Sequence, residues 1–108
     1  MIKLELKPLS VNCAFQGRRY KTKEYEQYER NALLLLPAFK LPEPPYKLTI
    51  EFGFSNKASD IDNPLKTTLD ILCKKYKFDD KDIYELNVKK VIVKKGAEYS
   101  QFKIETLK

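Results

Sequence analysis

Asp60 and Asp62 are separated by one residue and stand directly before a segment with helical spacing. In an extended segment, side chains two residues apart point to the same side, so we expect both carboxylates to face one spot, with Ile61 directed into the core. Carboxylates this close repel each other unless a cation joins them, and their hard oxygen atoms suit Mg²⁺ or Mn²⁺. Alternatively, the pair belongs to a polar loop in which Asp62 favours the positive end of the helix dipole.

Lys66 follows Asp62 by four residues and falls within the first turn of the expected helix. Cations usually stabilise the other end of a helix. A lysine at this end therefore indicates nearby anions, such as the paired carboxylates and a DNA phosphate. The alternative is an exposed ion pair with Asp70, one helical turn later.

A second acidic group, Asp79 and Asp80, follows the same expected helix. By itself it is typical of a solvated turn that begins a strand. A helix of about 13 residues would be about 20 Å long, and it separates Asp80 from Asp62. We therefore hypothesise that Asp80 completes the acidic site of a second subunit, so that the site forms only in a dimer. We assign Asp70 and Asp82 to the surface of the helix and of the following strand.

A basic cluster with an interleaved tyrosine occupies positions 18–21. Arginine and lysine beside an aromatic ring suit backbone phosphates and exposed bases. The residues that we expect to contact DNA are Asn12, Arg18, Arg19, Lys21 and Lys57. The alternative is an ordinary solvated loop, because an isoelectric point near 9.2 favours nucleic acid only modestly.

The composition narrows the class of protein. The chain has 108 residues and a net charge of +6, yet its aspartates all lie between positions 60 and 82. Histidine is absent, which excludes imidazole bases, Ser-His-Asp triads and His-based metal sites. Cys13 and Cys73 therefore have no histidine to activate a thiolate, and we interpret both as structural.

The hydrophobic content, 43% of the residues, is typical of a globular domain. The longest apolar run, 33–36, is too short to span a bilayer. The N-terminal residues alternate and show no signal-peptide core. We therefore expect a cytoplasmic protein with reduced thiols and one domain over 1–108.

Hydrophobic periodicity predicts the element order β-α-β-α-β-β. The expected strands cover 2–7, 46–54, 83–93 and 98–105, and the expected helices cover 22–36 and 64–76. Thr22 and Asn63 would cap the two helices, with Pro64 at the first helical position of the second. We predict an α+β fold with a mixed four-stranded sheet and two helices.

Three irregular segments are also expected. A long loop would cover 8–21. A change of phase in the third strand predicts a bulge near Lys89 and Lys90. Residues 94–97 would form a hairpin loop that leads into the last strand.

The motifs together resemble the RusA family of Holliday-junction resolvases. The acidic core reads Asp60-Ile-Asp62-Asn63-Pro-Leu-Lys66, and Phe78-Asp79-Asp80 follows it. The loop 8–12, the basic run 17–22 and the segment 25–28 look like the phage branch of that family, in the same order. The resemblance covers nearly the whole chain.

The resemblance implies Asp60, Asp62 and Asp80 as Mg²⁺-binding carboxylates, Lys66 as the catalytic lysine, and Asp79 as a secondary carboxylate. It implies a homodimeric endodeoxyribonuclease that resolves four-way DNA junctions by paired symmetric nicks in recombination and repair. The enzyme would be encoded by a phage or prophage and act in the cytoplasm of a bacterial host, without a membrane partner or an organic cofactor. The alternative functions are a non-catalytic module that binds branched DNA and keeps a vestigial acidic site, and an adaptor that binds a host protein.

Overall fold

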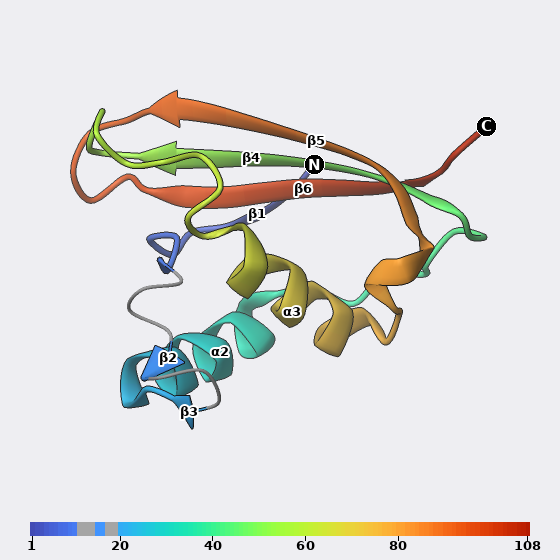
Figure 1. Cartoon of the computed structure of the whole chain (residues 1–108), viewed down its shortest axis with the longest axis horizontal. Helices are drawn as coiled ribbons and strands as arrows, with labels where there is room; N and C mark the ends of the chain where they lie inside the picture. Colours follow the sequence, from blue (N-terminus) through green and yellow to red (C-terminus); the bar gives the residue numbers. More distant parts are fainter. Residues whose placement is uncertain (11–14, 17–19) are drawn as a thin grey trace.

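A computed structural model describes residues 1–10, 15–16 and 20–108 (Figure 1). Its elements are β1 (Ile2–Leu4), β2 (Phe15–Gln16), β3 (Tyr20–Lys21), α2 (Lys23–Leu35), β4 (Tyr46–Phe54), α3 (Leu65–Tyr76), the 3₁₀ turn η1 (Asp80–Asp82), β5 (Ile83–Ile92) and β6 (Tyr99–Thr106). Within these described ranges, no helix is both long and apolar enough to cross a membrane.

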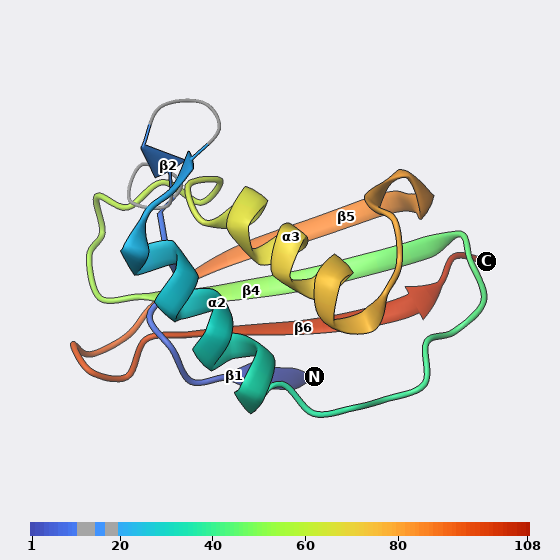
Figure 2. The same cartoon turned by 90° about the horizontal axis from the view of Figure 1, so that it is seen from below.

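Four strands form one mixed sheet in the order β1-β6-β4-β5. β4 and β5 run parallel, whereas β6 is antiparallel to both β4 and β1. Both α-helices cover the same face of this sheet, so the fold has two layers (Figures 1 and 2). The predicted α+β class with a mixed four-stranded sheet and two helices is confirmed.

The core forms between β4 and the two helices. Leu48, Ile50 and Phe52 alternate along β4 and are completely buried. Ile71 and Leu72 of α3 belong to the same buried cluster. Full burial of one such side chain stabilises the fold by about 1.5–3 kcal/mol relative to exposure, which fixes α3 against the sheet.

The helix starts were predicted with mixed success. Thr22 caps α2 as expected, since its hydroxyl oxygen accepts a hydrogen bond from the Tyr25 N–H at 3.1 Å. The prediction of Asn63 as the cap of α3 is wrong. The helix begins at Leu65, Pro64 takes the cap position, and no side chain caps this end. Asn63 instead uses its N–H to close the preceding turn, on the carbonyl oxygen of Asp60 at 3.2 Å.

The predicted hairpin over 94–97 is wrong, because β4 lies between β5 and β6. The chain crosses the end of β4, where the Val93 N–H donates to the Phe54 carbonyl oxygen at 2.8 Å. The loop does contain a turn, closed by the Ala97 N–H on the Lys94 carbonyl oxygen. The apolar strand β4 thereby obtains a hydrogen-bonded neighbour on each side.

The predicted bulge near Lys89 and Lys90 is also wrong. The β4–β5 ladder is regular from Glu85 to Ile92, and its irregularity lies between Tyr46 and Lys47. The apparent change of phase in the alternation of apolar residues arises because a charged residue, Lys90, occupies a helix-facing position of β5, opposite Phe52.

The N-terminal segment differs from expectation in two ways. β1 ends at Leu4 instead of position 7. It runs antiparallel to β6, and Leu4 pairs with Ser100, so only Tyr99 remains in β6 beyond this last pair. Within the expected loop 8–21, β2 and β3 form a short antiparallel pair.

Candidate functional site

Asp60 and Asp62 lie in the turn that connects β4 to α3, not in an extended segment. The Asn63 N–H donates to the Asp60 carbonyl oxygen, and the Leu65 N–H donates to the Asp62 carbonyl oxygen at 3.1 Å. Both aspartates are exposed. Ile61 is 40% exposed, so the expectation that it points into the core is wrong. The turn interrupts the two-residue alternation on which that expectation depended.

A groove along α3 brings together three of the predicted catalytic side chains. It has a volume of about 250 Å³ and is lined by Asp62, Leu65, Lys66, Leu69, Asp70 and Asp80. Asp70, which was assigned to the helix surface, therefore lies in the same groove as Lys66. Asp62 precedes α3 and Asp80 follows it, so the two enter the groove from opposite ends of the helix.

The three predicted metal ligands do not form an ion site within one chain. Among the residues that the structure describes, no three Asp, Glu, Cys or His side chains lie close enough together to hold a metal ion. The donor chemistry nevertheless suits Mg²⁺, because the groove presents exposed carboxylate oxygens. A site with three carboxylates would need one from outside this chain or a movement of the turn.

Lys66 and Asp70 form an ion pair at 3.7 Å, one helical turn apart. The two side chains are 66% and 42% exposed. Exposed pairs of this kind stabilise a fold by about 0–1 kcal/mol. The alternative interpretation of Lys66 as a partner of Asp70 is therefore present in the structure, and the pair is weak enough to leave the ammonium available to another anion.

Asp79 and Asp80 differ in environment although they are neighbours. The Asp79 carboxylate accepts the Lys81 N–H at 3.0 Å and so begins the η1 turn. This hydrogen bond is the main cause that lowers the pKa of Asp79 below its usual value. Asp80 is exposed and lines the groove. Asp79 thus holds the turn that presents Asp80.

Cys73 lies on α3 beside the acidic residues and is not part of a disulfide. Burial, and to a smaller extent the nearby carboxylates of Asp80, Asp70 and Asp79, together raise the pKa of its thiol to about 11. The group is therefore a neutral thiol at physiological pH and a poor nucleophile. This environment supports the structural interpretation of Cys73, whereas Cys13 lies outside the described residues.

The predicted DNA-contacting residues are only partly visible. Asn12, Arg18 and Arg19 lie outside the described residues, and the backbone of Lys21 pairs with Phe15 in the β2–β3 ladder. Lys57 is exposed in the loop that follows β4. This loop leads directly to Asp60.

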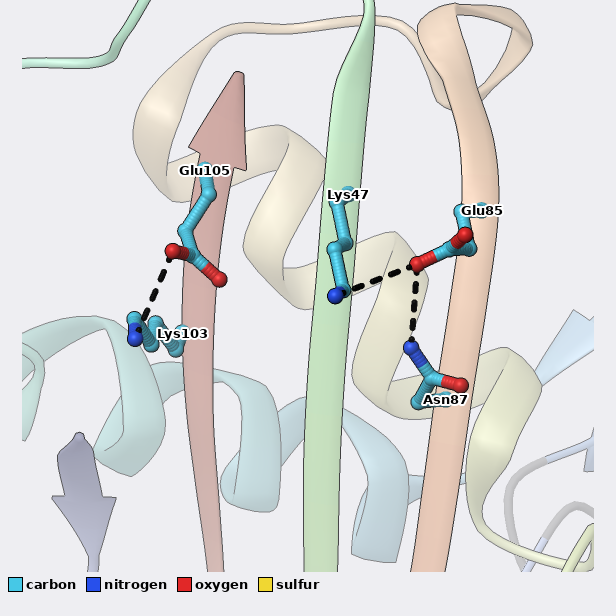
Figure 3. Close-up of polar contacts among 5 residues, drawn as sticks. All are labelled: Lys47, Glu85, Asn87, Lys103 and Glu105. Atoms are coloured by element: carbon cyan, nitrogen blue, oxygen red, sulfur yellow. Dashed lines mark hydrogen bonds and ion pairs between the residues drawn. The ribbon is translucent and has the colours of Figure 1, made fainter. Parts of the chain in front are cut away.

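The sheet face away from the helices carries paired charges (Figure 3). Lys47 binds Glu85 at 3.3 Å, and Lys103 binds Glu105 at 3.4 Å. Asn87 also donates to Glu85. This face therefore carries acidic and basic side chains next to one another, not lysines alone.

Lys90 is a residue that sequence reasoning missed. Its ammonium donates to the carbonyl oxygens of Lys57 at 2.7 Å and Ser59 at 2.5 Å, just before Asp60. The available signal was a lysine in an apolar position of an alternating strand, two residues after Val88.

A comparison of the sequence with known protein families covers the region that contains these site residues. Positions 10–99 match the family described as endodeoxyribonuclease RusA. The chain belongs to the RusA endodeoxyribonuclease family. The RusA match extends from before the basic run through both helices to the first residue of β6, and it includes Asp60, Asp62, Lys66 and Asp80. No curated protein matches the sequence significantly.

Proposed function

We propose that this RusA-family chain is a Mg²⁺-dependent endodeoxyribonuclease that resolves four-way DNA junctions by paired symmetric nicks. The observation that carries the proposal is the groove along α3, which Asp62, Lys66 and Asp80 line within the region matched to a deoxyribonuclease family. The whole chain, 1–108, would act as one catalytic domain. We infer a role in recombination and repair in the cytoplasm of a bacterial host, from a phage or prophage gene.

Asp60, Asp62 and Asp80 would hold the ion, since three aspartate carboxylates offer the oxygen ligands that Mg²⁺ and Mn²⁺ prefer. When bound, the ion would lower the pKa of a water molecule and stabilise the leaving oxygen. The three carboxylates do not converge within one described chain. The proposal therefore includes a homodimer in which Asp80 of one subunit completes the site of the other.

Lys66 would stabilise the negative charge that develops on the phosphate during cleavage. Its weak pairing with Asp70 leaves the ammonium free to turn toward DNA. Asn12, Arg18, Arg19, Lys21 and Lys57 would bind the DNA backbone, which gives affinity and register. A two-fold axis of the dimer would match that of the junction and place one site on each of two opposed strands.

The proposal is tested with a synthetic four-way junction, labelled on each strand in turn, and the purified protein with Mg²⁺. We expect nicks at symmetric positions on two opposed strands and none on a linear duplex of the same sequence. Asp60→Asn and Asp80→Asn should each lower the cleavage rate by at least about 100-fold, as for the loss of one essential electrostatic group. Asp82→Asn is the matched control in the same 3₁₀ turn and should cleave like the parent.

The same assay separates the alternatives. Tight junction binding without cleavage in Mg²⁺ or Mn²⁺ would favour a non-catalytic module for branched DNA. Binding of DNA should also weaken steeply with added salt, because phosphate contacts release counterions. A chain that neither binds nor cuts junctions would instead favour an adaptor for a host protein.

A further inference from the structure

Lys90 occupies an unusual place for a charged side chain. It lies on the helix-facing side of β5, opposite Phe52 in the parallel ladder and in phase with Val88. Its side chain is partly buried, and its ammonium stands 5.7 Å from the centroid of the Phe54 ring. A lysine whose stem crosses apolar surface needs acceptors for its charged end.

Two backbone carbonyls supply these acceptors. The Lys90 ammonium donates to the carbonyl oxygens of Lys57 and Ser59, at 2.7 and 2.5 Å. Hydrogen bonds from a charged donor are shorter and about twice as strong as neutral ones. They join β5 to a segment more than 30 residues earlier in the chain, and that segment ends immediately before Asp60.

The loop 55–59 is also anchored at its other end. The Ser55 hydroxyl donates to the Glu98 carboxylate at 2.7 Å, and the same carboxylate accepts the Gly96 N–H. Within the loop, the Ala58 N–H donates to the Asn56 side-chain oxygen at 2.8 Å. Of these anchors, Lys90 is the one adjacent to the Asp60–Asp62 turn. Its loss would release the end of the loop that leads into this turn.

We propose that Lys90 is a positioning residue of the nuclease. By holding the carbonyls of Lys57 and Ser59, it fixes the loop that leads into Asp60 and Asp62, and so restricts the positions that their carboxylates can take relative to Lys66. This inference rests on the proposed function. It assigns Lys90 no contact with DNA or with the reacting phosphate.

Three variants test the proposal. Lys90→Met keeps a flexible apolar stem over Phe54 and removes every donor, whereas Lys90→Arg keeps both the charge and donors. Lys89→Met is the matched control, since Lys89 is the exposed neighbour on the opposite face of the same strand. For each variant, junction cleavage is measured as a function of Mg²⁺ concentration, and junction binding is measured without Mg²⁺. Hydrogen exchange of the peptide over 55–62 reports on the loop itself, and thermal unfolding reports on overall stability.

We expect Lys90→Met to raise the Mg²⁺ concentration for half-maximal cleavage by about 10-fold or more, as for lost outer-shell support of metal ligands. Exchange over 55–62 should quicken, while junction binding without Mg²⁺ stays at the parental level. Lys90→Arg should restore most of the Mg²⁺ response, and Lys89→Met should match the parent.

Several results would overturn the inference. If the parent cleaves and Lys90→Met shows the same Mg²⁺ response and the same exchange over 55–62, Lys90 does not position the loop. If Lys90→Met unfolds and Lys90→Arg folds but keeps the defect in Mg²⁺ response, hydrogen bonding to the carbonyls is not what the site requires. A parent that binds junctions but never cuts them refutes the proposed function itself, and the positioning role with it.

Discussion

At the scale of single residues, the Lys66 ammonium pairs with one carboxylate and shares its groove with two more. Asp70 pairs with it at 3.7 Å, and Asp62 and Asp80 line the same groove. Because the pair with Asp70 is exposed, it stabilises little. We therefore expect a phosphate in the groove to take the place of Asp70. Cleavage should then depend strongly on Lys66 and only weakly on Asp70.

Lys66→Met and Asp70→Asn should accordingly have different effects on cleavage. We expect Lys66→Met to lower the single-turnover rate by about 100-fold or more, since a charge that stabilises the transition state is lost. Asp70→Asn should change the rate by less than about 5-fold, because an exposed ion pair contributes at most about 1 kcal/mol. Both rates are measured on the same junction at saturating protein. Equal losses in the two variants would show that Asp70 belongs to the catalytic group.

At the scale of elements, β4 and β6 are fitted to each other around Gly53. A Cβ atom on Gly53 would lie 2.4 Å from Cε1 of the Tyr99 ring. The Tyr99 hydroxyl donates to Glu51 at 2.6 Å, and the Lys3 ammonium stands 4.5 Å from the ring centroid. The ring cannot move away without weakening these contacts, so the position of the Tyr99 ring over β4 requires glycine here.

Gly53→Ala should therefore destabilise the protein by about 1–3 kcal/mol, the usual cost of overpacking. The measurement is urea-induced unfolding followed by circular dichroism. In a Tyr99→Ser background, the same Gly53→Ala change should cost little, because the ring that the methyl group meets is absent. An equal cost in both backgrounds would mean that the backbone of β4, and not the Tyr99 ring, excludes a side chain at this position.

At the scale of the whole molecule, the proposed ion site draws on the turn before α3 and on the turn after it. Asp60 and Asp62 precede it and Asp80 follows it, and within the described chain no three metal-binding side chains converge. A dimer would complete the ion site if each subunit lends Asp80 to the other.

Mixing two inactive variants distinguishes the two arrangements. If Asp80 acts across the dimer, subunits with Asp62→Asn and subunits with Asp80→Asn form heterodimers with one wholly parental site and one doubly altered site. After subunit exchange, we expect these mixtures to recover cleavage on single strands, although each homodimer is inactive. If Asp80 acts within its own subunit, every site keeps one altered residue and no recovery follows. A junction assay with each strand labelled measures the result.

Several features of this protein were predictable because their physical causes are local. Helical and two-residue periodicity located both helices and the central strand β4, which lies at 46–54 as predicted. The Thr22 cap depends on a hydrogen bond only three residues long. The acidic core and the basic run were sufficient to indicate the RusA family, which the match over 10–99 confirms.

Other features depend on contacts between distant segments, which local patterns do not specify. An alternating strand shows which face is buried but not which neighbour it will pair with, so the placement of β4 between β5 and β6 contradicted the expected hairpin. For the same reason, the lysine at a helix-facing position of β5 suggested a bulge in the strand. The strand is regular there, and the ammonium of Lys90 is satisfied by the carbonyls of Lys57 and Ser59, which are distant in sequence. The sequence by itself determined the elements, the candidate carboxylates and the family. Only the tertiary structure decided the strand order, the turn at Asp60 and the residues that meet in the groove, because each of these results from packing between parts of the chain far apart in sequence.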